Sequence, residues 1–198
     1  MLRIEPITLA GRLARLEPLG PHHLQDLQQA TADGTLSNLW YTSVPTADGM
    51  AAEIERRHGL QAAGSMLPFT VIRQGDDKAV GMTTYMNIDA INDRLEIGST
   101  WIGSSAQGTG INAECKLMLL THAFETLGCI AVEFRTHFMN RQSRAAIERL
   151  GTKQDGILRS HMRLPNGTVR DTVVYSIIAS EWPAVRANLE HRLSRHSG

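Results

Sequence analysis

Two glycines in a polar loop, between a strand-like segment and a long apolar segment, constrain this chain more than any other feature. Residues 94–102 have the pattern of a strand, and residues 111 to 127 are apolar enough to form a buried helix. Gly108 and Gly110 lie directly before that helix. Glycine lets backbone N–H groups approach a ligand closely, and the first turn of a helix presents unpaired N–H donors at the positive end of its dipole. The loop therefore predicts an anion site, and a phosphate suits it best.

A dinucleotide-binding motif is one interpretation of this loop. The spacing Gly108-x-Gly110-x-x-Ala113, with Glu133 further along the chain, matches that motif. The context argues against it, because the motif normally follows an apolar strand directly. Here Glu96 lies in the strand, and a mostly polar stretch separates the strand from the glycines. Too little chain follows for two mononucleotide-binding halves.

Two short patterns favour a different interpretation. The segment Gln107-x-x-Gly110-x-Asn112 resembles the pyrophosphate-binding segment Gln/Arg-x-x-Gly-x-Gly/Ala of the GNAT superfamily of acyl-CoA N-acyltransferases. Asn112 stands where that family usually has a small residue, although asparagine tolerates unusual backbone angles. The segment Asn140-x-x-Ser143, followed by Ile-Glu-Arg-Leu-Gly at 147–151, resembles the second coenzyme-binding segment of the RimJ/RimL-like branch, which modifies the N-termini of ribosomal proteins. The resemblance covers roughly residues 8–179.

The resemblance implies an acyl-CoA-dependent N-acetyltransferase, with acetyl-CoA or another acyl-CoA as co-substrate and a primary amine as acceptor. In the family the amine attacks the thioester directly in a ternary complex. The pyrophosphate lies against the glycine loop, and the pantetheine arm pairs with backbone near Trp101 and Ile102. The residues implied to contact the coenzyme are Trp101, Ile102, Gln107, Gly108, Thr109, Gly110, Ile111, Asn112, Ala113 and Asn140. Whether the acyl group is acetyl, succinyl or another stays open.

Glu96 is the candidate general base. A charged residue in an otherwise apolar strand is costly unless it is paired, exposed or functional. A salt bridge to Arg94 or Arg135 is one explanation. The other follows from the resemblance, which aligns Glu96 with the glutamate that many family members use, often through water, to deprotonate the acceptor. A single carboxylate suits an α-amine, with a pKa of about 7.7–8.0, better than a lysine side chain near about 10.4.

Asn140 and Ser143 each have a structural and a functional interpretation. Asn140 is a good N-cap for a short helix, Ser143 falls in the first turn of that helix, and Gly151 is expected to end it. Asn-Gly at 166–167, between β-rich segments, predicts a hairpin turn. The resemblance adds that Asn140 hydrogen-bonds the pantetheine arm and that Ser143 lies near the departing sulfur, where its hydroxyl protonates the thiolate. Tyr175 is the alternative acid, although a tyrosine in a strand is more often part of the core.

The residues that contact the acceptor are harder to assign. The irregular segment 38–45 contains Trp40 and Tyr41. Trp40 either packs in the core or, by the resemblance, belongs to a wall of the acceptor cleft. His161 either assists catalysis or is simply solvated. We expect a protein or peptide N-terminal α-amine, or a small-molecule α-amine, as acceptor. A non-catalytic acyl-CoA-binding or interaction module on the same fold is the alternative function.

Hydrophobic periodicity predicts an α/β fold with a mixed, mostly antiparallel, seven-stranded sheet flanked by helices. Expected strands cover 8–18, 67–73, 79–87, 94–102, 129–138, 157–164 and 169–179, and expected helices start at 21, 46–48, 111, 140 and, as a polar segment, 181. The segments 94–102 and 129–138, joined by a helix, are the one obvious parallel pair. The resemblance to the GNAT fold implies that these central strands splay apart. We expect a single domain, 1–198, with a core over about 8–179 and a C-terminal helix and tail over 180–198.

Composition argues against several other classes. The formal net charge is zero, whereas a nucleic-acid-binding domain is normally strongly basic. No segment approaches the roughly 20 apolar residues of a membrane span, and the N-terminus lacks the apolar run of a signal peptide, so we expect a cytoplasmic protein without membrane contact. Cys115 and Cys129 imply no disulfide. The histidines lack metal-ligand spacing, so no metal is expected, and His22 and His23 are expected to be exposed. The oligomeric state is not readable, and a homodimer through the C-terminal hairpin is a working guess.

Overall fold

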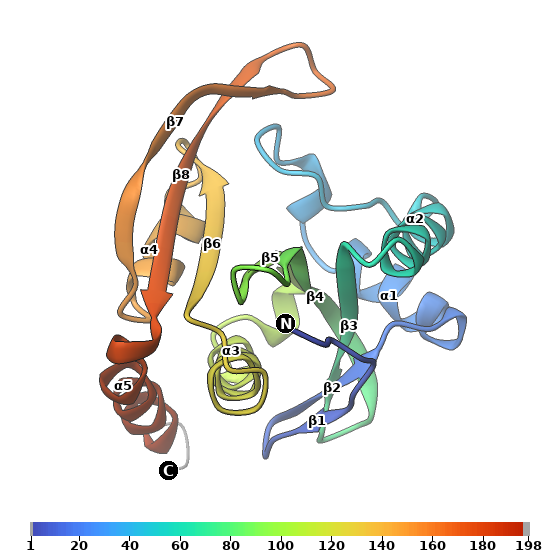
Figure 1. Cartoon of the computed structure of the whole chain (residues 1–198). Helices are drawn as coiled ribbons and strands as arrows, with labels where there is room; N and C mark the ends of the chain where they lie inside the picture. Colours follow the sequence, from blue (N-terminus) through green and yellow to red (C-terminus); the bar gives the residue numbers. More distant parts are fainter. Residues whose placement is uncertain (1, 196–198) are drawn as a thin grey trace.

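Eight strands form one mixed sheet in the computed structural model, which describes residues 2–195 (Figure 1). The strands are β1 (Leu9–Ala10), β2 (Ala14–Pro18), β3 (Met66–Arg73), β4 (Lys78–Asp89), β5 (Arg94–Ile102), β6 (Ala131–His137), β7 (Lys153–Arg163) and β8 (Val169–Ile178). Their order in the sheet is β1-β2-β3-β4-β5-β6-β8-β7. Every neighbouring pair is antiparallel except β5 and β6, which are parallel. The predicted α/β class and the predicted parallel pair are confirmed.

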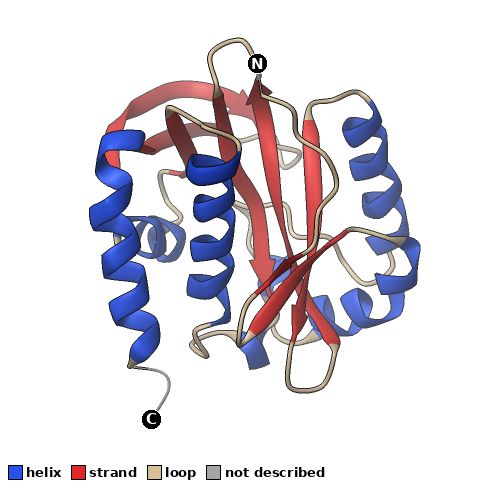
Figure 2. Cartoon of the chain, turned by 60° about the horizontal axis from the view of Figure 1, so that its bottom comes forward, coloured by secondary structure: helices blue, strands red, loops and turns tan. Residues whose placement is uncertain are grey.

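Helices cover both faces of the sheet (Figure 2). One face carries α1 (Leu24–Ala32) and α2 (Met50–Ala62), and the other carries α3 (Ile111–Thr121), α4 (Arg141–Glu148) and α5 (Trp182–Ser194). Short helical turns complete the set: η1 (Pro21–His23), η2 (Leu36–Asn38), η3 (Ser104–Ala106), η4 (His122–Thr126) and η5 (Ala179–Glu181). Side chains alternate between the faces of a strand, so each face has its own apolar core.

The predicted first strand is in fact two strands, which is why the sheet has eight strands and not seven. β1 and β2 form a hairpin in which Leu9 lies opposite Leu16. The turn at Gly11 is held from outside, because the Glu114 carboxylate on α3 accepts hydrogen bonds from the backbone N–H groups of Arg12, Leu13 and Ala14, at 2.9, 2.7 and 2.8 Å. A single uninterrupted strand would leave this buried carboxylate without its donors.

The C-terminal helix was predicted to be polar, and this prediction is wrong for one face of it. Trp182, Val185, Leu189 and Leu193 are buried, at a spacing that puts them on one side of α5. They pack with α3, and Figure 2 shows the two helices side by side on the same face of the sheet. The helix therefore belongs to the core, whereas residues 196–198 of the predicted tail lie outside the described residues.

Pairing between β5 and β6 stops after three residues. Arg94, Leu95 and Glu96 lie opposite Ala131, Val132 and Glu133, and no further pair follows although both strands continue. The predicted splay of the central strands is therefore confirmed. On its other side, β5 has a bulge against β4, where Ser99 has a φ of 47°.

Several predicted helix and hairpin ends are confirmed. Asn140 caps α4 by accepting a hydrogen bond from the Ser143 N–H at 3.0 Å. Gly151, at a φ of 99°, follows the end of this helix, and Gly167, at 83°, lies in the turn between β7 and β8. Cys115 and Cys129 are both buried and free. None of the helices within residues 2–195 combines the length and apolar character needed to cross a membrane.

The contact of Glu114 with the β1–β2 turn generates a stability prediction. Glu114→Ala leaves three partly or fully buried N–H groups without acceptors, so the free energy of unfolding in urea should fall by about 3 kcal/mol. Glu190→Ala is the matched control, because Glu190 lies exposed on α5 in an i,i+4 pair with Arg186. We expect no measurable change there. Equal destabilisation by the two substitutions would contradict the role given to Glu114.

Candidate functional site

The glycine loop has the geometry that the sequence predicts. Gly108 and Gly110 both have left-handed backbones, with φ of 76° and 89°, and Gly110 is the N-cap of α3. The position that a side chain would occupy at Gly108 is open space. The Gln107 side chain donates to the Ile102 carbonyl at 2.8 Å and so ties the loop to the end of β5. The first N–H groups of α3 have no acceptor within the helix. Backbone donors, open space and a helix start thus lie together beside β5.

The other predicted coenzyme contacts lie around the point where β5 and β6 separate. The side chains of Trp101 and Ile102 are buried on opposite faces of the sheet, which leaves the backbone of these residues as their available contact. Asn140 follows β6, and its Oδ1 is occupied by the cap of α4. The splay brings the ends of β5 and β6 and the starts of α3 and α4 to one region, and coenzyme binding there stays a prediction.

Glu96 lies on the opposite face of β5 from the α3 core. Its neighbours Leu95 and Ile97 point into that core, so alternation turns Glu96 towards the face that carries α1 and α2. The carboxylate is 5% exposed. Its Oε2 accepts from Asn87 Nδ2 at 2.7 Å and lies 3.6 Å from Arg135 Nε. Its Oε1 lies only 2.8 Å from where a Cβ would be at residue 98, so Gly98 makes room for it.

A network of charges surrounds Glu96 and settles which salt bridge it makes. Arg94 donates to Glu133 Oε1 at 2.6 Å, and Arg135 donates to Glu133 Oε2 at 2.7 Å. Of the two partners suggested by the sequence, Arg135 is near Glu96, whereas Arg94 pairs with Glu133. A concavity of about 360 Å³ opens here, lined by residues of β4, β5 and β6 that include Asn87, Glu96 and Arg135.

Burial makes Glu96 a stronger base than an ordinary glutamate. Desolvation raises the pKa of Glu96, and the hydrogen bond from Asn87 and the charge of Arg135 oppose this only in part. The hydrogen bond and the ion pair both fall on Oε2. Oε1 has neither of these contacts and lies beside the Gly98 backbone, near the Met86 sulfur, so it is the carboxylate oxygen best placed to accept a proton.

Ser143 and Tyr175 differ in their surroundings. Ser143 lies in the first turn of α4, next to the separated end of β6, and is half-buried. Tyr175 is 1% exposed and belongs to the α3 core. Its hydroxyl donates to Glu148 at 2.7 Å and accepts from Arg144 at 3.1 Å. The core interpretation of Tyr175 fits these contacts, and Ser143 has the more accessible of the two hydroxyls.

The loop after η2 meets the far end of β6 and the tip of the β7–β8 hairpin. Trp40 is 51% exposed, so core packing is the wrong interpretation for it. Trp40 and Tyr41 instead stand against the ring of His137, with centroids 5.3 and 6.2 Å away, and Asn166 donates to the Trp40 carbonyl at 3.2 Å. No motif or spacing in the sequence pointed to His137. The exposed His161 contacts the Thr172 hydroxyl on β8, at 3.0 Å, as part of the same hairpin.

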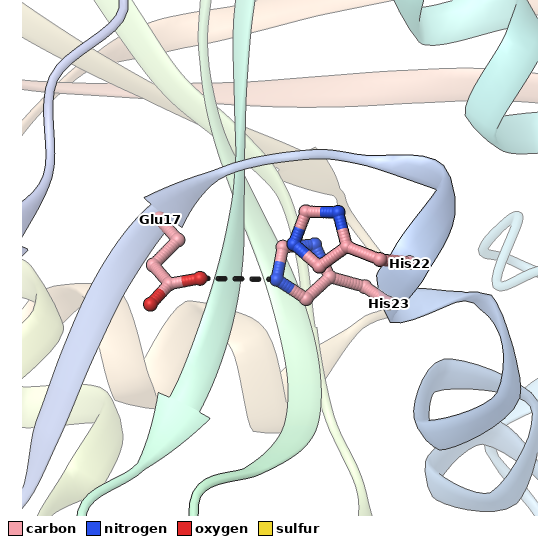
Figure 3. A group of neighbouring side chains, drawn as sticks. All are labelled: Glu17, His22 and His23. Atoms are coloured by element: carbon pink, nitrogen blue, oxygen red, sulfur yellow. Dashed lines mark hydrogen bonds and ion pairs between the residues drawn. The ribbon is translucent and has the colours of Figure 1, made fainter.

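A group of potential metal ligands, Glu17, His22 and His23, lies at the end of β2 (Figure 3). His22 is exposed as predicted, but His23 is buried, contrary to the prediction. The Gly20 N–H donates to His23 Nδ1 at 3.1 Å, so the neutral ring carries its proton on Nε2 and donates it to Glu17 at 3.1 Å. Arg15 pairs with the other oxygen of Glu17. Both ring nitrogens of His23 are thus engaged in hydrogen bonds, and His22 contacts the His23 ring with a centroid distance of 3.9 Å.

Comparison with known proteins identifies a family model that matches most of this chain. Residues 14–153 match the family model described as an acetyltransferase (GNAT) domain. YdaF of Bacillus subtilis (strain 168), provisionally named a ribosomal N-acetyltransferase, is 36% identical over 107 residues, which is 54% of this chain and 57% of that protein. The chain thus spans little more than half the length of this relative.

Solved structures of acetyltransferases share the fold of this chain. A GCN5-related N-acetyltransferase from Brucella melitensis is 30% identical, with a TM-score of 0.86 over 95% of this chain and 86% of that chain. Mycobacterium smegmatis RimJ, in complex with CoA-disulfide, is 22% identical, with a TM-score of 0.79 over 94% of this chain and 95% of that chain. The predicted resemblance to the acetyltransferase (GNAT) family is confirmed, and the chain shares the fold of RimJ.

The raised pKa of Glu96 generates a prediction for stability. Burial of the charged carboxylate costs stability as the pH rises through its pKa, and the cost is absent where the group is protonated in both the folded and unfolded states. Glu96→Gln should therefore be more stable than wild type at pH 7. The difference should disappear as the pH falls below the ordinary glutamate value of about 4.3. Urea unfolding from pH 4 to 8 measures this, with Glu55→Gln on the exposed side of α2 as the control. A substitution that destabilises more at pH 7 than at pH 4 would contradict it.

Proposed function

The chain belongs to the GNAT family of acetyltransferases, and from this premise we propose that it moves an acetyl group from acetyl-CoA to an α-amine. The acceptor is the N-terminus of a protein or peptide, or a small-molecule α-amine. Membership of the family favours an enzyme over the non-catalytic module that the sequence left open. The observation that carries the proposal is the buried Glu96, which lies where β5 and β6 separate and directs one oxygen over Gly98.

The glycine loop fits the pyrophosphate of coenzyme A. Gly108 and Gly110 have left-handed backbones, the space at Gly108 is open, and α3 begins directly behind. The stretch of β5 at Trp101 and Ile102 pairs with β4 but not with β6, and its edge towards β6 suits the amides of the pantetheine arm. The remaining contacts are those of Gln107, Thr109, Ile111, Asn112, Ala113 and Asn140. When bound, acetyl-CoA supplies the thioester, and the protein supplies its position.

Glu96 accepts the proton of the amine. Its raised pKa makes it a better base than an ordinary glutamate, while the Asn87 amide and Arg135 hold it in place. The choice of acceptor follows from the work this single carboxylate must do. At pH 7 roughly a tenth of an α-amine is neutral, whereas only about one lysine side chain in 2,500 is neutral. An α-amine is therefore deprotonated by a single carboxylate more readily than a lysine side chain is.

Ser143 and the loop at Trp40 complete the proposal. The Ser143 hydroxyl, at the start of α4, protonates the departing thiolate. Trp40 and Tyr41, with His161 on the hairpin, bound the acceptor side of the site. Trp40 is half exposed although it is a large aromatic residue, which fits a wall that contacts a bound molecule.

Two matched peptides test the acceptor class and the base together. Both have the same sequence with one lysine, and one carries an acetyl group on its N-terminus whereas the other carries it on the lysine. We expect release of free thiol from acetyl-CoA to be faster with the free α-amine. In Glu96→Gln, kcat/KM for that peptide at pH 7 should fall by about 10²–10⁴-fold, the range of general base catalysis.

Two outcomes would contradict this assignment. The first is an ε-amine that reacts faster than the α-amine, which would remove the acceptor class. The second is a Glu96→Gln enzyme with the kcat/KM of wild type, which would remove Glu96 as the base. Binding of coenzyme A to Glu96→Gln, measured by calorimetry, checks that the substitution leaves the coenzyme site intact.

A further inference from the structure

The bulge of β5 is a strained feature held at the site. Met82 and Thr84 of β4 lie opposite Trp101 and Gly98, so Thr83 alone faces both Ser99 and Thr100. Ser99 has a φ of 47°, a left-handed conformation that is strained for a residue other than glycine. Such a conformation persists only where its surroundings hold it.

Two buried cations hold this bulge, one from each face of the sheet. Arg57 of α2 is 2% exposed; its guanidinium donates to the Thr84 hydroxyl at 2.6 Å and to the Ser99 carbonyl at 3.4 Å. Arg57 also donates to the Glu53 carboxylate at 2.7 Å, which Arg56 contacts as well. The cation on the face of α1 and α2 therefore has a carboxylate as its counter-ion.

Lys116 of α3 is the cation on the opposite face, and its charge is not balanced. Its ammonium donates to the hydroxyls of Thr83 and Thr100, at 3.1 and 3.0 Å, and these hydroxyls lie 2.8 Å apart. Among the described residues it has only these two hydroxyls and no carboxylate as partners. Burial lowers the pKa of Lys116 to about 8, which still leaves most of it charged at pH 7.

An isolated buried ammonium is a poor device for stability alone. Removing an ion from water costs several kcal/mol, and an apolar side chain of similar volume normally fills such a site better. Lys116 nevertheless lies beneath the core strands, next to the residues at which β5 and β6 have separated. A charge without a counter-ion, in a region of low dielectric constant, favours an anion that forms beside it.

We propose that Lys116 is a positioning residue for acyl transfer. Through Thr83 and Thr100 it holds the β5 bulge, and its ammonium stabilises the negative charge that forms on the acyl oxygen beside this bulge. This inference rests on the proposed function. The amine nitrogen forms a bond to the acyl carbon, and the electron pair of the C=O bond moves to its oxygen. Return of that pair breaks the C–S bond. The amine proton passes to Glu96, and the thiolate takes up a proton from Ser143 or water. Lys116 lowers the energy of the intermediate that carries the charged oxygen.

Lys116→Met tests the inference, because methionine keeps much of the volume and removes the charge. We expect kcat with acetyl-CoA and the α-amine peptide to fall by about 10–100-fold, less than the loss of a direct oxyanion donor. The Kd of free coenzyme A, which has no acyl carbonyl, should change by less than about threefold. A residue that merely supported the fold would not separate these two quantities. Lys78→Met, which removes an exposed lysine at the start of β4, is the control for loss of charge.

Several other outcomes bear on the role of Lys116. A wild-type kcat in Lys116→Met, or a loss of coenzyme A affinity as large as the loss of kcat, would overturn the inference. If Lys116→Met does not fold, Thr100→Val decides, because it keeps the charge and removes one hydroxyl partner; a reduced kcat with an unchanged Kd supports the inference and a wild-type kcat overturns it. Wild-type protein without transferase activity would overturn the proposed function and this inference together, whereas an active wild type with an equally active Lys116→Met overturns the inference alone.

Discussion

Parallel pairing between β5 and β6 ends at Glu96 and Glu133, and the chemistry that we propose depends on that break. A strand that loses its neighbour leaves N–H and C=O groups that need other partners. The bulge at Ser99 lies just beyond this break, and the glycine loop at the end of β5 leads into α3. A coenzyme arm made of amides suits the open edge of β5. Glu96 and its charged neighbours lie at the same break, on the side that we propose for the acceptor.

Several local costs gather at this break. Ser99 is strained, Glu96 is a buried acid with a raised pKa, and Lys116 is a buried base with a lowered pKa. Each departs from what stability alone would favour, and functional sites are where proteins tolerate such departures. The surrounding fold is well supported, because an apolar core fills each face of the sheet and the Glu114 carboxylate fixes the first hairpin.

Much of the fold could be predicted from the sequence because local signals are strong where the chain turns. Glycine spacing predicted the loop before α3, and Asn140 and Gly151 marked the ends of α4. The failures have a common physical cause, which is contact between residues far apart in the chain. The turn at Gly11 is held by a carboxylate about a hundred residues away, and His23 is buried by its contact with Thr70 on β3.

The candidate site was predictable to the same extent. Periodicity placed Glu96 in a strand and motif spacing placed the loop, but neither reveals which face a residue occupies after a bulge. Lys116 lies in an apolar segment, but the sequence does not show what its ammonium contacts, because only the strand register brings Thr83 and Thr100 to it. Trp40 is similar, because its exposure depends on where the β7–β8 hairpin ends.

We propose that the separated end of β5 and the glycine loop hold the coenzyme. Hydrogen exchange of the backbone amides tests this proposal most directly. Coenzyme A should slow exchange of the amides of residues 101–113, and of Gly108 and Gly110 above all, whereas the hairpin of β1 and β2 should not change. Protection from exchange should be confined to residues 101–113 and to the start of α4. Protection elsewhere on the sheet, or none at saturating coenzyme A, would contradict it.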